Sequence, residues 1–252
     1  MNDFNFNNSN DGQGVVVDAP WKSQSNIDIS ALMRTVYMWM VFGLLTTAGV
    51  AAFVAAQPIE FIVGVSQWWL GIVLLQLGLV LGINFGFNKL SPTMAGGLFF
   101  LYAAVNGLLF GVIFFTYIAQ GQSMAIANAF LTTSALFGAM TIVGFTTKVD
   151  LSKFGTFLMM GVIGLFIAIV VNMFLGSSML DLVISVAGVL IFTALTAYDT
   201  QQIKEMAQSM VYYGQSQSEM AAKLSIMGAL KLYLDFINLF LFLLRLFGGG
   251  RD

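Results

Sequence analysis

Long stretches without a charged side chain constrain this chain more than any other feature. No Asp, Glu, Lys or Arg lies between Arg34 and Glu60, and none lies in the 58 residues between Lys89 and Lys148. A helix needs about 20 mainly apolar residues to cross the hydrocarbon core of a bilayer. These stretches therefore predict membrane-spanning helices rather than the core of a soluble domain.

The composition agrees, because only 9% of the 252 residues are charged and 58% are hydrophobic. A soluble domain carries about 25% charged residues. The sequence has no Cys and no His. Their absence excludes disulfides, metal sites with Cys or His ligands, and Ser-His-Asp or Cys-His catalysis. We therefore expect no enzyme and no covalently bound cofactor. The net charge of −2 gives no reason to expect nucleic acid binding.

The uncharged stretches and the polar breaks between them predict an all-α integral membrane protein with a seven-transmembrane-helix bundle. All three prolines fall outside the expected helices, as a helix interior requires. Residues 1–30, rich in Asn, Ser, Gly and Gln, predict a disordered polar tail before a transmembrane domain of residues 31–252. The expected helices cover residues 32–56, 62–87, 94–116, 124–146, 154–175, 180–202 and 225–247, with a polar connection at 204–223.

Lys and Arg are distributed unevenly between the two expected membrane faces. The face of the N-terminal flank holds seven of them, whereas the opposite face holds only Arg245 and Arg251. Cytoplasmic segments carry the excess of Lys and Arg. We therefore expect a cytoplasmic N-terminus. The seven are Lys22, Arg34, Lys89, Lys148, Lys153, Lys204 and Lys223.

Two aspartates, Asp199 and Asp235, interrupt segments that are otherwise apolar. A charge at the centre of a bilayer costs about 2.5–3.5 kcal/mol on insertion scales, so such a residue usually faces the bundle interior and serves a function. The expected helix directions let the two carboxylates meet in the cytoplasmic half of the membrane. Together they could share a proton, bind a hard cation such as Ca²⁺, or belong to a structural ion pair.

The last expected helix carries a polar stripe formed by Lys231, Asp235, Asn238 and Arg245, whose spacing places them on one face. In the simplest interpretation Lys231 pairs with Asp235 within the helix and Arg245 extends to the membrane interface. A lysine in a seventh helix also suggests a retinal protein, but the third helix has no carboxylate to serve as counter-ion. Two membrane aspartates suggest an intramembrane protease, but Asp235 lacks the Gly-x-Gly-Asp context expected there.

Three segments of the chain resemble the bacterial branch of the transmembrane Bax inhibitor family. They are Thr146-Thr-Lys-Val-Asp-Leu-Ser152, Ala197-Tyr-Asp-Thr-Gln-Gln-Ile-Lys204 and the segment from Gly228 to Arg245, which reads Gly-Ala-Leu-Lys-Leu-Tyr-Leu-Asp-Phe-Ile-Asn-Leu-Phe-Leu-Phe-Leu-Leu-Arg. The resemblance covers nearly the whole chain beyond the polar tail. It implies seven helices with the last at the centre, in the bacterial inner membrane.

The resemblance also implies a pH-dependent calcium leak with a di-aspartyl sensor, which corresponds here to Asp199 and Asp235. Bacterial relatives carry an arginine near the cytoplasmic end of the second helix that latches the first of these aspartates. Here that region reads Asn84-Phe-Gly-Phe-Asn-Lys-Leu-Ser91 and has no arginine. Lys89 or Lys231 would have to pair with Asp199 instead.

The leading hypothesis is therefore a passive, pH-dependent leak of Ca²⁺ or another cation. Asp199 and Asp235 would bind the cation and sense protons, and Lys89, Lys231, Asn238 and Arg245 are candidates for gating or pairing. The alternative is a regulatory membrane protein that binds and restrains a membrane protease or another membrane complex, as some bacterial relatives are thought to do. The polar tail would offer such a partner a docking element.

Overall fold

The computed structural model describes residues 29–86, 89–213 and 217–249. These residues are almost entirely helical and include no strand. Seven of the helices are long and apolar enough to cross a membrane, which confirms the predicted bundle. The elements are α1 (Ile29–Ala55), α2 (Ile59–Gln67), α3 (Trp69–Gly86), α4 (Pro92–Ala119), α5 (Ser123–Thr146), the short 3₁₀ helix η2 (Leu151–Phe154), α6 (Gly155–Leu175), α7 (Ser178–Tyr213) and α8 (Gln217–Gly248).

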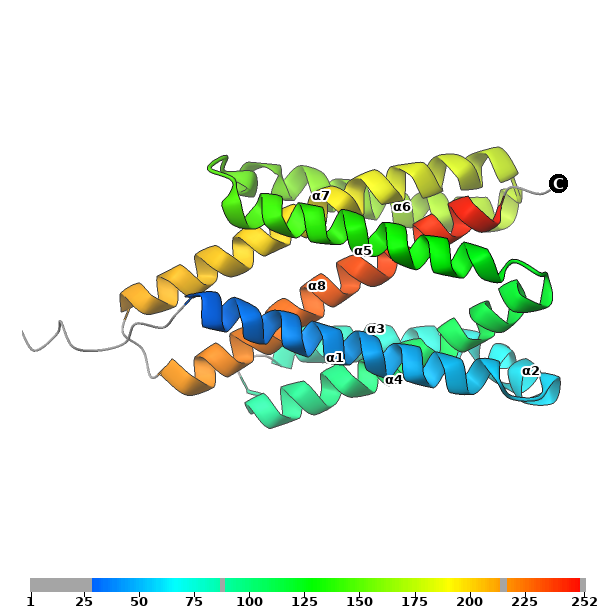
Figure 1. Ribbon diagram of the computed structural model, residues 1–252, viewed down its shortest axis with the longest axis horizontal. Coiled ribbons are helices and arrows are strands. Elements are labelled where there is room, and N and C mark those ends of the chain that lie inside the picture. Colours follow the sequence, from blue (N-terminus) through cyan, green and yellow to red (C-terminus); the bar gives the residue numbers. More distant parts are fainter. Residues whose placement is uncertain (1–28, 87–88, 214–216, 250–252) are drawn as a thin grey trace, which may run out of the picture.

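The bundle consists of two groups of helices with α8 between them (Figure 1). One group contains α1 and α4, which pack together along their length, with α2 and α3 beside α4. The other contains α5, α6 and α7, with α7 in the middle. The last helix contacts α1, α4, α5 and α7, so it joins the groups. This arrangement confirms the expectation that the last helix is central.

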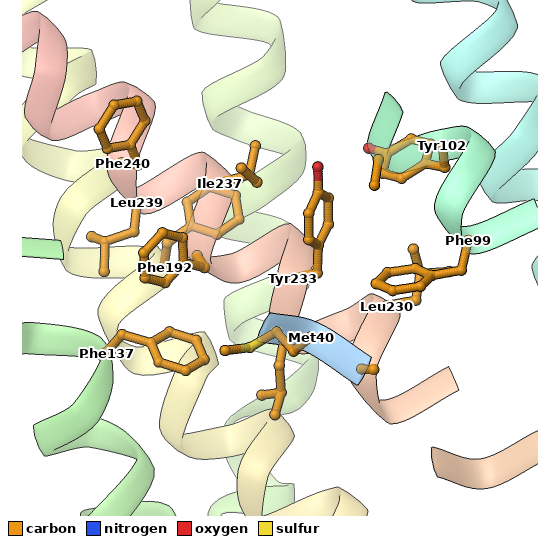
Figure 2. Packing of buried hydrophobic residues seen from close by; sticks show 14 of the residues in the cluster. Met40, Phe99, Tyr102, Phe137, Phe192, Leu230, Tyr233, Ile237, Leu239 and Phe240 are labelled. Atoms are coloured by element: carbon orange, nitrogen blue, oxygen red, sulfur yellow. The ribbon is translucent and has the colours of Figure 1, made fainter. Parts of the chain in front are cut away.

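The burial of the helices follows from this arrangement. In α8, 72% of the most apolar 18-residue window is buried, against 44% in α4 and 6% in α3. The centre of the core is Tyr233 of α8, which is fully buried. Its ring meets the rings of Phe99 and Tyr102 edge-on, at centroid distances of 5.6 and 5.8 Å (Figure 2). Such aromatic contacts add to the packing of α8 against α4.

The expected second helix, residues 62–87, is in fact two helices, and that prediction was wrong. The chain turns at Trp68, where α2 ends and α3 begins. With nine residues, α2 is only about 14 Å long and too short to cross a bilayer. The break falls inside an apolar stretch, so the absence of charge that defined the expected helix could not reveal it.

The expected polar connection at residues 204–223 is also largely helical. On one side α7 continues to Tyr213, and on the other α8 begins at Gln217. This segment is rich in Lys, Glu, Gln, Met and Ala, all of which favour helix. Polarity marks the end of the apolar span and not the end of the helix. Of the predicted polar tail, residues 1–28 lie outside the described residues, and residues 29 and 30 already belong to α1.

Two further local features correct or refine the expected boundaries. Pro92, expected in a turn, is the first residue of α4, where proline fits because its missing N–H needs no partner. The Ser91 hydroxyl caps this helix by accepting a hydrogen bond from the Met94 N–H at 3.3 Å. Gly144 of α5 lies against the backbone of Ala197 in α7, where a Cβ would collide with it. Gly144 therefore lets α5 pack closely beside the segment that carries Asp199.

Candidate functional site

The two aspartates singled out above lie side by side between α7 and α8. Asp199 projects from α7 and Asp235 from α8, and their carboxyl groups are within interaction distance of each other. The Asp235 side chain is buried, and that of Asp199 is 13% exposed. Because α7 and α8 pack against each other as an antiparallel pair, residues far apart in the sequence reach the same level of the bundle.

Lys231 pairs with Asp199 across the helix interface and not with Asp235 within its own helix. Its Nζ lies 3.6 Å from Asp199 Oδ1. It also donates a hydrogen bond to Oε1 of Gln202, which lies one turn beyond Asp199 on α7. The lysine therefore joins α8 to α7 through two acceptors. The intrahelical pair considered from the sequence is absent among the described ion pairs.

Asp235 retains one carboxyl oxygen without a partner. Its Oδ2 is buried and accepts no hydrogen bond from the described residues. A buried polar group without a hydrogen bond costs free energy, and an isolated buried carboxylate costs far more. A proton or a cation at this oxygen would remove that cost. Asp235 Oδ2 is therefore the atom of the site at which a proton or a cation could bind.

The charges of the three neighbouring groups do not cancel. With both carboxyls ionised, Asp199 and Asp235 carry two negative charges and Lys231 carries one positive charge. The cluster then has a net charge of −1 in an interior of low dielectric. One bound proton brings the net charge to zero, and one bound divalent cation brings it to +1. The arrangement can therefore exchange a proton for a cation at the same carboxyls.

The residues that follow Asp199 hold the turn between α5 and α6. Gln201 donates from Nε2 to the Val149 carbonyl at 2.8 Å and accepts at Oε1 from the Leu151 N–H at 2.7 Å. Lys204 Nζ donates to the Phe145 carbonyl at 2.7 Å, at the C-terminal end of α5. A cation at this position also interacts favourably with the helix dipole. These contacts explain why the segment from Ala197 to Lys204 is so polar.

The turn itself is organised by Asp150. Its carboxylate accepts hydrogen bonds from the Ser152 N–H at 3.0 Å and from the Ser152 hydroxyl at 2.5 Å. These hydrogen bonds lower the pKa of the exposed Asp150 carboxyl below its ordinary value. The turn between α5 and α6 is thus ordered both by its own carboxylate and by Gln201 of α7.

The other three gating candidates lie elsewhere. Lys89 is exposed in the turn between α3 and α4, and no described side chain pairs with it. Asn238 donates to the Leu234 carbonyl of its own helix at 2.8 Å. Arg245 lies near the far end of α8, where its NH1 is 3.7 Å from Asp181 Oδ1 of α7. Of the predicted candidates, only Lys231 joins the aspartates.

A second polar contact in the bundle interior links α1, α4 and α8. The hydroxyls of Tyr233 and Thr47 are hydrogen-bonded at 2.6 Å, and Thr47 Oγ1 lies 2.9 Å from the Ala103 carbonyl. Tyr233 and Thr47 are both buried. A Tyr–Thr–carbonyl chain satisfies these hydroxyls where no water is needed. It also holds α8 against α1 and α4.

Sequence reasoning missed several residues of these contacts. Gln202 lies three residues after Asp199, so its position on the same face of α7 was a usable signal. Asp181 was visible as the acid at the opposite end of the expected sixth helix, in register to meet Arg245. Thr47 carried no signal, because a threonine in an apolar helix usually bonds its own backbone.

The described residues contain no group of three or more Asp, Glu, His or Cys side chains that could hold a metal ion. A bound cation would have as ligands the two carboxylates, the side-chain amide oxygen Oε1 of Gln202 and any water present. Asp199 and Asp235 remain the predicted metal ligands. Such a set suits a cation that binds transiently, because tight Ca²⁺ sites use six to eight oxygen ligands.

Comparisons with known proteins agree with the architecture. The sequence profile of the family "Inhibitor of apoptosis-promoting Bax1" matches residues 29–252. An uncharacterized protein of Deinococcus radiodurans is 43% identical over 230 residues, which cover 91% of this chain and 95% of that protein. The inner membrane protein YbhL of Escherichia coli K12 is 42% identical over 230 residues, or 90% of this chain and 95% of YbhL.

A more distant relative extends the same pattern. An uncharacterized membrane protein of Streptococcus pyogenes is 33% identical over 234 residues, which cover 90% of this chain and 96% of that protein. The family profile, which matches residues 29–252, spans all seven membrane-capable helices. The resemblance stated from the motifs is thereby confirmed. This chain is a multi-pass inner-membrane protein, and it belongs to the Bax inhibitor family.

Proposed function

We propose that this protein is a passive cation leak in which Asp199 and Asp235 bind the cation and compete for it with protons. Ca²⁺ is the proposed cargo, because carboxylate and amide oxygens are the ligands that it prefers. The observation that carries the proposal is the buried cluster of two carboxyls and one ammonium, with Asp235 Oδ2 left open.

The proposed gate is Lys231. In the structure its ammonium occupies the space between Asp199 and Gln202, which are the oxygens that an entering cation would use. A divalent cation has to displace this ammonium or bind beside it at Asp235. Because Lys231 is a point charge without the bidentate geometry of arginine, it can leave one acceptor without losing a fixed pair of hydrogen bonds.

The direction of the pH dependence follows from the charge of the cluster. Protons and Ca²⁺ compete for the same carboxyl oxygens. Lowering the pH fills these oxygens with protons, so we expect the flux to fall as the pH falls. No histidine is available to sense protons in its place.

The test is Ca²⁺ flux into liposomes that contain the purified full-length protein, measured from about pH 5 to about pH 8. We expect Asp235→Asn to abolish the pH dependence and Asp199→Asn to alter gating, since the second change frees Lys231. The matched control is Glu205→Gln, which removes an exposed carboxylate from the same helix α7. It should behave like the wild type.

Unchanged pH-dependent flux in both aspartate variants would contradict the proposed site. Absence of flux above empty liposomes at every pH would contradict the leak itself. That second result would favour the alternative role, a regulator of a membrane protease or another membrane complex. Deletion of residues 1–25 separates these roles further, because a leak should survive the deletion and an interaction through the tail should not.

A further inference from the structure

An apolar groove lies between the two groups of helices, on the side where α1 and α5 face each other (Figure 1). Its volume is about 660 Å³, within the range of sites that hold small molecules. Four helices line it: α1 and α5 form the sides, α8 forms the floor, and α4 also contributes to the lining. On α1 and at the residue that follows it, the lining residues are mainly alanines, whose small side chains leave the space open: Ala48, Ala51, Ala52, Ala55 and Ala56.

The lining is almost purely hydrocarbon. Only Thr47 and Ser123 contribute hydroxyl groups, and Thr47 is already engaged with Tyr233 and the Ala103 carbonyl. No charged side chain lines the groove. A ligand inside it therefore needs no polar atoms, which excludes an ion, a nucleotide or a lipid headgroup within the groove itself.

The length of the groove matches one leaflet of a membrane. From Leu44 to Ala55 the lining follows α1 for 12 residues, a rise of about 18 Å, against about 30 Å for the whole hydrocarbon core. It begins at the end of α1 and reaches the middle of the bundle at Thr47. Exposed apolar side chains border it on both sides, such as Phe53 of α1 and Leu131 of α5. These side chains face the hydrocarbon of the bilayer, and the groove lies between them.

We propose that this groove binds one acyl chain of a phospholipid from the leaflet on the side of the α1–α2 connection. An acyl chain has the required apolar surface and the length of one leaflet. The polar N-terminal segment is a poor occupant, because it is rich in Asn and Asp and joins α1 at Ile29, the opposite end of the helix. Next to the lining residues Ala56 and Ser123 the chain carries the uncharged residues Gln57 and Gln122, so the proposal specifies no headgroup charge.

The occupied groove has a direct neighbour in the candidate site. Its floor includes Phe236 and Ile237, the two residues that follow Asp235 on α8. A bound chain would pack against these side chains and keep water from reaching the Tyr233–Thr47 contact. The binding proposal does not depend on the leak, and its test below has a readout other than flux.

The test measures the phospholipid retained by the full-length protein after exchange into a second detergent, by native mass spectrometry. Ala52→Trp and Ala127→Trp place a bulky side chain in the groove. The matched control is Ala135→Trp, because Ala135 is also an exposed alanine of α5 but does not line the groove. We expect the wild type and the control to retain about one phospholipid per chain, and both groove variants to retain about tenfold less.

Equal retention by Ala127→Trp and Ala135→Trp, or no retained phospholipid in the wild type, would overturn the proposal. A retained free fatty acid would overturn the assignment to phospholipid. A dimer that dissociates on Ala127→Trp would show that a second copy fills the groove. If the tryptophan variants misfold, wild-type protein can be labelled with a phospholipid carrying a diazirine within its acyl chain. Cross-links at Phe236 or Phe240 are expected, and cross-links confined to outward-facing residues such as Phe53 would contradict the proposal.

Discussion

Two contacts between helices of this bundle differ in the chemistry of their side chains. The interface between α7 and α8 contains ion pairs, and the seam between α1 and α5, where the groove lies, is lined by apolar side chains. Two ion pairs join α7 to α8, Asp199 with Lys231 near the middle of both helices and Asp181 with Arg245 near one end. Between α1 and α5 the structure instead leaves an apolar groove. Charged side chains pair across the interface between α7 and α8, whereas no charged side chain lines the groove between α1 and α5. Paired charges therefore fill the interface between α7 and α8, and an apolar ligand suits the seam between α1 and α5.

Removing Lys231 should disturb the charged interface most. Lys231→Met leaves the carboxyls of Asp199 and Asp235 together without a neighbouring cation, so the folded protein must take up a proton or another cation. We expect a loss of about 2–3 kcal/mol in the free energy of unfolding near neutral pH. This is below the range for fully buried pairs, because 36% of the Lys231 side chain remains exposed. Thermal unfolding in detergent measures it.

The matched control for this change is Lys223→Met on the same helix. Lys223 pairs with Glu219, whose side chain is 64% exposed. An exposed pair four residues apart contributes about 0.3–0.5 kcal/mol. Equal losses in the two variants would mean that the charge of Lys231 is not needed between α7 and α8.

A smaller effect is expected where α1 joins α8 beside the open seam. Thr47→Val keeps the shape of the side chain but removes the hydrogen-bond partner of the Tyr233 hydroxyl and the contact with the Ala103 carbonyl. We expect a loss of about 1–2 kcal/mol, typical of a buried group left unsatisfied. Combining it with Tyr233→Phe in a double-mutant cycle should recover part of this loss. Strictly additive losses would show that the two hydroxyls do not depend on each other.

The smallest effect is expected at the far end of the charged interface. Arg245→Gln removes the partner of Asp181, but these side chains are 42% and 48% exposed and 3.7 Å apart. A pair of this kind contributes about 0–1 kcal/mol. The same unfolding measurement should therefore show a shift well below that of Lys231→Met. A loss as large as that of Lys231→Met would make the two ion pairs equally important and remove the contrast between them.

Much of this architecture could be predicted from residue order alone. Membrane-spanning helices need uncharged stretches, so seven of them and their approximate bounds follow from the positions of charged residues. The meeting of Asp199 and Asp235 follows from opposite helix directions. The break at Trp68 could not be predicted, because both sides of it are apolar. The continuation of α7 to Tyr213 was missed because hydropathy identifies the part of a helix that lies in the membrane and does not show where the helix itself ends.

The sequence left two possible partners for Lys231 and could not decide between them, for a different reason. Asp235 is four residues away on the same helix, and Asp199 is on another helix. The choice of Asp199 depends on how α7 is rotated about its axis, since that rotation also brings Gln202 to the lysine. The Thr47–Tyr233 contact likewise joins residues 186 positions apart. The packing of all neighbouring helices sets the rotation of each helix, so a local sequence pattern cannot predict that rotation.

The central position of α8 has a consequence for how the protein is made. Synthesis runs from the N-terminus, so the helix that joins the two groups is the last to leave the ribosome. Until α8 enters the bilayer, Asp199 lacks its ion-pair partner Lys231, and Thr47 lacks its hydrogen-bond partner Tyr233. A nascent chain stopped before Gln217 would therefore contain six of the seven membrane-capable helices and lack the one that makes them a single protein.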